Sequence, residues 1–115
     1  MLDAGQKQTL LLSMAPYVCL ALYDGWLHER ARRVPAAEQL FHAAAFLSFA
    51  LLIASLFLNR PRLALPSLAG FALATAVDEL RFHGGLERRE RGLHFAAYAC
   101  FATFVAVAWR IGALA

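Results

Sequence analysis

The sequence predicts an all-α membrane protein, a four-transmembrane-helix up-down bundle built from two repeated helical hairpins. Three observations support this fold class: a very apolar composition, four separate apolar stretches, and one acid–histidine spacing that occurs four times. Of the 115 residues, 61% are hydrophobic, which is well above the proportion in soluble domains. The length allows one domain, so we expect residues 1–115 to form a single transmembrane unit.

Four apolar stretches account for this composition. They cover residues 9–23, 41–58, 63–77 and 95–109. Each is somewhat shorter than the ~20 residues that span a bilayer as a helix. All four reach that length if the helices continue into the polar residues at one end. A buried soluble bundle is the alternative. A cleaved signal peptide is a further alternative for the first stretch, although no small-x-small cleavage site follows it.

The first two helices are bounded by proline and asparagine. We expect the first helix over residues 8–30, with a kink at Pro16. Pro35 suits the first position of the second helix. Asn59, which precedes the Arg60-Pro61 step, suits the C-terminal cap of that helix.

The third and fourth helices follow the same logic. The third is predicted from Pro61 to Phe82, and a tight turn at residues 84–85 follows it because both are glycine. The fourth is predicted from Leu86 to Arg110, with Gly112 just beyond its end.

The two halves of the chain align with each other. Residues 34–46 align without gaps to residues 86–98, which superimposes one Glu-x-x-x-His on another. Upstream, Asp24–His28 matches Glu79–His83. This self-similarity predicts two repeats, at about residues 8–59 and 61–112.

Every histidine of the chain follows an acid by four residues. The pairs are Asp24–His28, Glu38–His42, Glu79–His83 and Glu90–His94. Eight acids in 115 residues occupy about 7% of positions, so four chance pairings have a likelihood of about 2 in 100,000 before allowing for the choice of spacing. Residues four apart share one helix face. Each pair can therefore present one oxygen and one nitrogen ligand in the same direction.

Helix direction sorts these ligands into two levels. The first and third helices run toward the side of the first and third connections, and the second and fourth helices run away from that side. One level would contain Asp24, His42, Glu79 and His94, and the next would contain His28, Glu38, His83 and Glu90. Each level then offers two carboxylates and two imidazoles, which predicts two divalent metal ions whose charge balances the four carboxylates. Asp78 is the substitute ligand, because it neighbours Glu79.

The ligand types favour iron, with zinc or manganese as alternatives. The set is similar, at motif level only, to that of soluble di-iron bundles, which use Glu-x-x-His rather than a spacing of four. Tyr98 lies one turn deeper than His94, and Tyr17 lies two turns deeper than Asp24. These tyrosines are the candidates for a catalytic role, and no organic cofactor is predicted.

The leading functional hypothesis is a di-iron oxidoreductase or oxygenase that acts on a lipid-soluble substrate. A di-zinc membrane hydrolase and a non-catalytic metal-binding or accessory subunit are the alternatives. A hydrogen-bonded polar layer without metal, and ligation of haem or chlorophyll, are the competing interpretations of the histidines. Few serines and threonines interrupt the apolar stretches, so no continuous ion route is predicted.

The net charge of +3 lies at helix ends and in connections, as in membrane proteins, which argues against nucleic acid as a partner. Seven basic residues flank the first and third connections: Arg30, Arg32, Arg33, Arg81, Arg88, Arg89 and Arg91. Four flank the other side: Lys7, Arg60, Arg62 and Arg110. We therefore expect a bacterial inner-membrane protein with the metal site and these two connections in the cytoplasm and both termini outside. The bilayer is the expected partner; a homo-oligomer or a larger membrane complex stays open.

Overall fold

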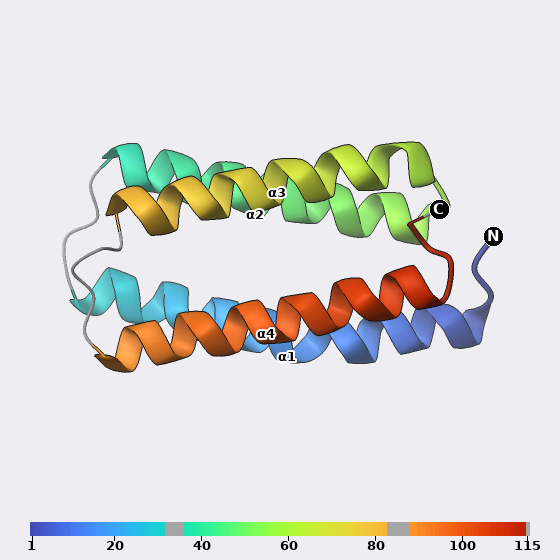
Figure 1. The fold of residues 1–115 in the computed structure, drawn as a ribbon, viewed down its shortest axis with the longest axis horizontal. Coiled ribbons are helices and arrows are strands. Elements are labelled where there is room, and N and C mark those ends of the chain that lie inside the picture. The colour runs from blue at the N-terminus through green and yellow to red at the C-terminus, as the bar shows by residue number, and fades with distance from the viewer. Residues whose placement is uncertain (32–35, 83–87, 115) are drawn as a thin grey trace. The chain divides into compact units, whose positions relative to one another are not determined.

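The computed structural model describes residues 1–31, 36–82 and 88–114, although not the side chains of residues 28–31, 81, 82 and 89. The described residues are all-helical (Figure 1). The helices are α1 (Ala4–Ala31), α2 (Ala36–Phe57), α3 (Pro61–Phe82) and α4 (Arg88–Arg110). The predicted all-α chain of four helices is confirmed, and α1 begins four residues earlier than predicted.

Asp3 explains the early start of α1. Its side-chain Oδ1 accepts a hydrogen bond of 2.7 Å from the backbone N–H of Gln6. In return, Oε1 of Gln6 accepts one of 3.0 Å from the backbone N–H of Asp3. This reciprocal arrangement is a capping box, which satisfies backbone donors that a helix start otherwise leaves without partners. Downstream, α1 continues as one helix through Pro16.

The turn between α2 and α3 confirms the predicted cap. Asn59 has a φ of 55°, a left-handed conformation that asparagine tolerates better than most residues. The N–H of Arg60 reaches back to the carbonyl of Ser55 at 2.8 Å, as in a Schellman-type helix end. Pro61, the first residue of α3, has no backbone N–H, and an N–H at this position would have had no helical partner.

The end of α4 also has a left-handed residue. Gly112, with a φ of 78°, lies just beyond it.

The helices pack in two pairs, α2 with α3 and α1 with α4, and each pair forms a compact unit. Within the first pair, the rings of Phe49 and Phe71 lie 5.6 Å apart between centroids. Within the second, Tyr17 and Phe101 lie 5.1 Å apart. In each pair the two helices run in opposite directions (Figure 1). The predicted repeats at residues 8–59 and 61–112 are a correspondence between two parts of the sequence. The helix pairs do not test that correspondence, so the repeats stay a prediction.

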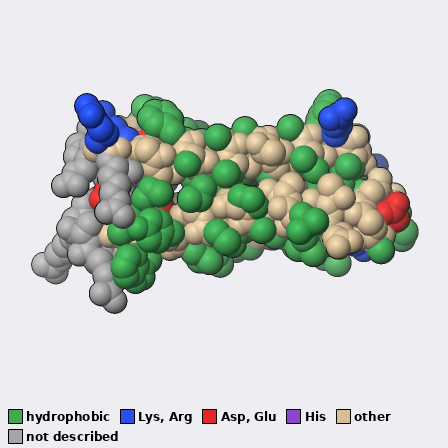
Figure 2. Space-filling model, turned by 90° about the horizontal axis from the view of Figure 1, so that it is seen from below, with side chains coloured by type: hydrophobic (Ala, Val, Ile, Leu, Met, Phe, Trp, Pro, Cys, Tyr) green, Lys and Arg blue, Asp and Glu red, His purple; other side chains and the backbone are tan. Residues whose placement is uncertain are grey.

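All four helices contain a segment long and apolar enough to cross a membrane. The segments are Ala4–Leu27, Ala36–Phe57, Pro61–Leu80 and Glu90–Arg110, of 24, 22, 20 and 21 residues. Large apolar side chains such as Leu12, Phe46 and Leu73 are exposed. On the face in Figure 2, hydrophobic side chains cover the length of the helices and Lys and Arg lie near the ends. Such a surface fits lipid and indicates a membrane protein.

Candidate metal centre

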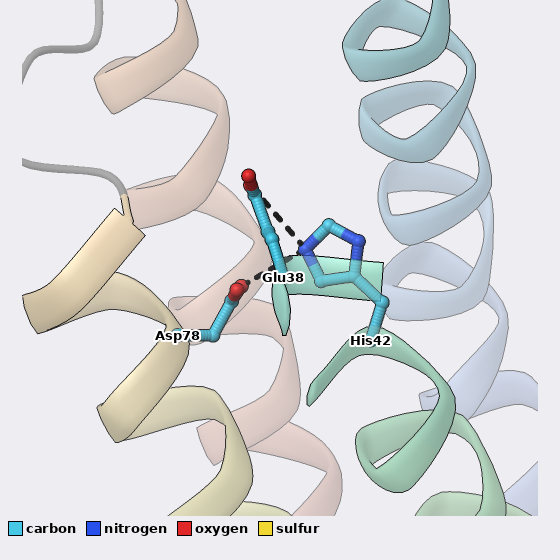
Figure 3. Close-up of side chains that lie close together, drawn as sticks. All are labelled: Glu38, His42 and Asp78. Atoms are coloured by element: carbon cyan, nitrogen blue, oxygen red, sulfur yellow. Dashed lines mark hydrogen bonds and ion pairs between the residues drawn. The ribbon is translucent and has the colours of Figure 1, made fainter. Parts of the chain in front are cut away.

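One histidine and two acids of the α2·α3 unit converge on a single point (Figure 3). The Nε2 atom of His42 lies 3.1 Å from Oδ2 of Asp78 and 3.8 Å from Oε1 of Glu38. One ligand atom from each residue lies within 4.8 Å of the other two. The group of Glu38, His42 and Asp78 can therefore hold a metal ion, and we name it the α2·α3 cluster.

Helix geometry brings these three residues together. Glu38 is in the first turn of α2, and His42 follows it by one turn on the same face. Because α2 and α3 are antiparallel, the start of α2 lies beside the last turns of α3, where Asp78 is located. Asp78 continues the buried stripe of α3 that includes Phe71 and Ala74. The packing of the apolar side chains of α3 therefore also points the Asp78 carboxylate toward His42.

Burial of the two acids disfavours their charged forms unless a positive charge or hydrogen-bond donors lie beside them. The side chain of Glu38 is 1% exposed and that of Asp78 is 12% exposed, whereas that of His42 is 38% exposed. The N-terminus of α2 favours the Glu38 carboxylate through its unpaired N–H groups and helix dipole. A neutral imidazole carries one N–H, so Nε2 can donate to only one carboxylate at a time. A divalent cation would contact both carboxylates and cancel their combined charge.

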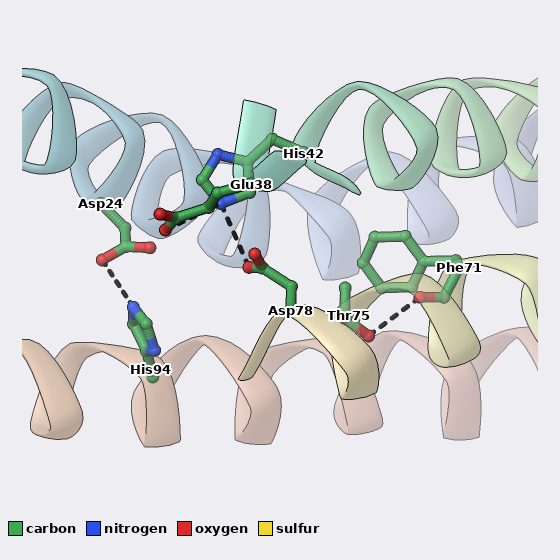
Figure 4. A network of polar contacts seen from close by, with 7 residues as sticks. All are labelled: Asp24, Glu38, His42, Phe71, Thr75, Asp78 and His94. Atoms are coloured by element: carbon green, nitrogen blue, oxygen red, sulfur yellow. Dashed lines mark hydrogen bonds and ion pairs between the residues drawn. The ribbon is translucent and has the colours of Figure 1, made fainter. Parts of the chain in front are cut away.

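The α1·α4 unit contains a second acid–histidine contact (Figure 4). The Nε2 atom of His94 lies 3.0 Å from Oδ1 of Asp24, and the His94 side chain is 6% exposed. Glu90 lies one turn before His94, and its Oε2 atom is buried without a hydrogen bond among the described residues. The ring of Tyr98 contacts the His94 ring edge-on, with centroids 6.3 Å apart. Tyr98 is thus beside His94, and its catalytic role stays a prediction.

The remaining candidates are placed less fully. His83 lies outside the described residues. His28 is within α1, but its side chain lies outside the described part. Tyr17 packs against Phe101. The contribution of Glu79 to a metal site stays a prediction, as does the eight-ligand set as a whole.

The α2·α3 cluster differs in two ways from the two ligand levels that the sequence predicts. Asp78, which the sequence offered only as a substitute for Glu79, is the α3 acid that bonds His42. Glu38 and His42 were expected at different levels, yet both contribute to one cluster because a glutamate side chain can span a helical turn. Asp78 lies four and seven residues after Ala74 and Phe71, and the burial of those two residues in the structure places it on the packed side of α3.

Three protein ligands leave coordination positions open on a four- to six-coordinate ion, where water or a substrate can bind. In the described ranges, the α2·α3 cluster is the one group of three acids, histidines or cysteines with this spacing. The known protein families, characterised proteins and solved structures give no significant match to the chain. The chemistry of the side chains therefore carries the functional argument.

Proposed function

We propose that this chain is an integral membrane metalloprotein whose α2·α3 cluster binds a divalent metal ion, with iron as the favoured metal. The observation that carries the proposal is the convergence of two buried carboxylates on one imidazole nitrogen, within 4.8 Å. Oxygen and imidazole ligands together suit iron, and zinc and manganese are the alternatives.

The chemistry follows from the ligands and their surroundings. A bound iron would supply redox chemistry with oxygen, and the open coordination positions would give access to the substrate. Glu38 and Asp78 would hold the ion and balance its charge, and His42 would fix its position between them. The exposed apolar helix surfaces fit a lipid-soluble substrate that reaches the site from the bilayer. We therefore propose an oxidoreductase or oxygenase, and extend the proposal to a cytoplasmic site in a bacterial inner membrane.

Elemental analysis of the detergent-purified full chain tests this function. Wild-type protein is compared with His42→Ala and with the control Ser67→Ala, which removes an exposed α3 hydroxyl that bonds the carbonyl of Leu63. We expect iron in the wild type and in the control, and a lower iron content in His42→Ala. Oxidation-state-dependent absorption would identify iron, whereas zinc would be spectroscopically silent.

Two results would contradict the proposal. A His42→Ala variant that keeps the full metal content would remove the cluster as the site. A folded wild type that takes up no added iron, zinc or manganese would leave Glu38, His42 and Asp78 as an interhelical hydrogen-bond layer. Stoichiometric zinc without iron would retain metal binding and redirect the chemistry to hydrolysis by a metal-bound water.

A further inference from the structure

The α1·α4 unit repeats the ligand pattern of the α2·α3 cluster on its own two helices. Glu90 and His94 are the third and seventh residues of α4, as Glu38 and His42 are of α2. In each unit, the histidine Nε2 bonds an aspartate on the antiparallel partner helix, at 3.0 Å for Asp24 and 3.1 Å for Asp78. The unit therefore offers the same three ligand types.

The carboxylate of Glu90 gives an independent indication of a cation site. Its Oε2 atom is buried and makes no hydrogen bond within the described ranges. A buried carboxylate oxygen without a partner is unfavourable. The nearest histidine along α4 lies one turn away, and such a pair of residues has Cβ atoms only about 5–6 Å apart. That spacing lets the Glu90 side chain reach an ion held by His94.

We propose that Asp24, Glu90 and His94 form a second divalent-cation site, separate from the α2·α3 cluster and weaker than it. This inference deepens the proposed function and rests on it. The weaker binding follows from the geometry. Glu38, His42 and Asp78 have their ligand atoms gathered within 4.8 Å, whereas in the α1·α4 unit only Asp24 and His94 are already in contact.

The environment of the second site also differs in chemistry. The ring of Tyr98 lies against His94, and the equivalent position in α2 is Phe46, which has no hydroxyl. A phenol beside the ligand can donate a proton or a hydrogen bond, which the Phe46 ring cannot do. The two ions would therefore have different surroundings.

Cobalt(II) binding to the metal-free full chain in detergent tests this inference by equilibrium dialysis. We expect two ions per wild-type chain, bound in two steps of different affinity. His94→Ala should retain only the tighter step, and His42→Ala only the weaker one. Glu90→Gln should weaken the second step by about 10-fold or more and leave the first unchanged. Thr103→Ala is the matched α4 control, because its exposed hydroxyl bonds the carbonyl of Ala99.

The outcomes separate the two proposals. If His94→Ala still binds two ions, or if the wild type binds one ion that only His42→Ala loses, the second site is wrong and the α2·α3 site stands. If the one ion is instead lost only in His94→Ala, the proposed function at His42 fails. A single ion lost in both variants overturns the two-site inference. Should His94→Ala fail to fold by circular dichroism, Asp24→Asn, which keeps the side-chain size, replaces it.

Discussion

At the scale of single residues, Asp78 decides how the α2·α3 cluster is built. Its Oδ2 atom lies 3.1 Å from Nε2 of His42, and it is buried on the packed side of α3. Glu79 is displaced from it by about 100° around the helix. The carboxylate of Asp78 is therefore placed to share an ion with His42, and the neutral amide of asparagine would bind that ion much less well.

We predict that Asp78→Asn weakens divalent-metal binding by at least about 10-fold, the lower end of the losses found for supporting groups around metal sites. Glu79→Gln is the matched comparison, because it makes the same chemical change at the next residue. We expect it to leave the affinity within a few-fold of wild type. Cobalt(II) titration of both variants measures the difference. A larger loss in Glu79→Gln would make Glu79 the ligand and remove Asp78 from the site.

The sequence was sufficient to find two members of this cluster and ambiguous for the third. Glu38 and His42 are recognisable because they lie on one helix, at a spacing that the histidines repeat. The choice between Asp78 and Glu79 depends on which side of α3 faces α2. That side is difficult to predict because α3 is apolar nearly all round, so no polar face indicates its orientation.

At the scale of helices, close contact between α2 and α3 determines the geometry of the cluster. A Cβ atom added at Gly70 of α3 would lie 3.3 Å from Oγ of Ser48 in α2. Small residues at such positions allow membrane helices to approach each other. Phe49 and Phe71 pack nearby, across the same pair.

We predict that Gly70→Leu destabilises the protein by about 1–3 kcal/mol through overpacking, and that it weakens metal binding by separating Asp78 from His42. Gly25→Leu is the control, because no atom of the described residues lies within 4 Å of a Cβ added there. Both substitutions raise helix propensity, so the difference between them reports the contact. Unfolding temperature in detergent and cobalt(II) affinity are the measurements. Equal unfolding temperatures would show that Gly70 is not a packing position.

Helix ends were easier to predict than helix partners. Asn59 and Pro61 define a helix end and a helix start through backbone chemistry that acts locally. Pairing depends on distinguishing lipid-facing from protein-facing apolar residues. On α2, Phe46 is exposed and Leu52 is buried, yet both are large and apolar, so composition does not separate them. The pairing of α1 with α4 and of α2 with α3 therefore required the structure.

At the scale of the whole molecule, charge and hydropathy together predict orientation. Each of the four apolar segments can cross a bilayer, so successive connections would lie on alternating sides. Seven basic residues flank the first and third connections and four flank the other side. Connections rich in Lys and Arg tend to stay in the cytoplasm.

We predict that a cysteine at position 88 is reached only from the cytoplasm and one at position 60 only from outside, since one span, α3, separates them. Arg88→Cys and Arg60→Cys each change an exposed residue. Each removes one positive charge, the first from the side with seven basic residues and the second from the side with four, so the first side stays the more basic in both variants. Both are made in a Cys19→Ala/Cys100→Ala background and labelled with a membrane-impermeant maleimide in intact spheroplasts and in inverted vesicles. Labelling of both from one side would contradict the four-span topology. Exchanged labelling would keep the spans and reverse the orientation, which would place the α2·α3 cluster at the outer surface.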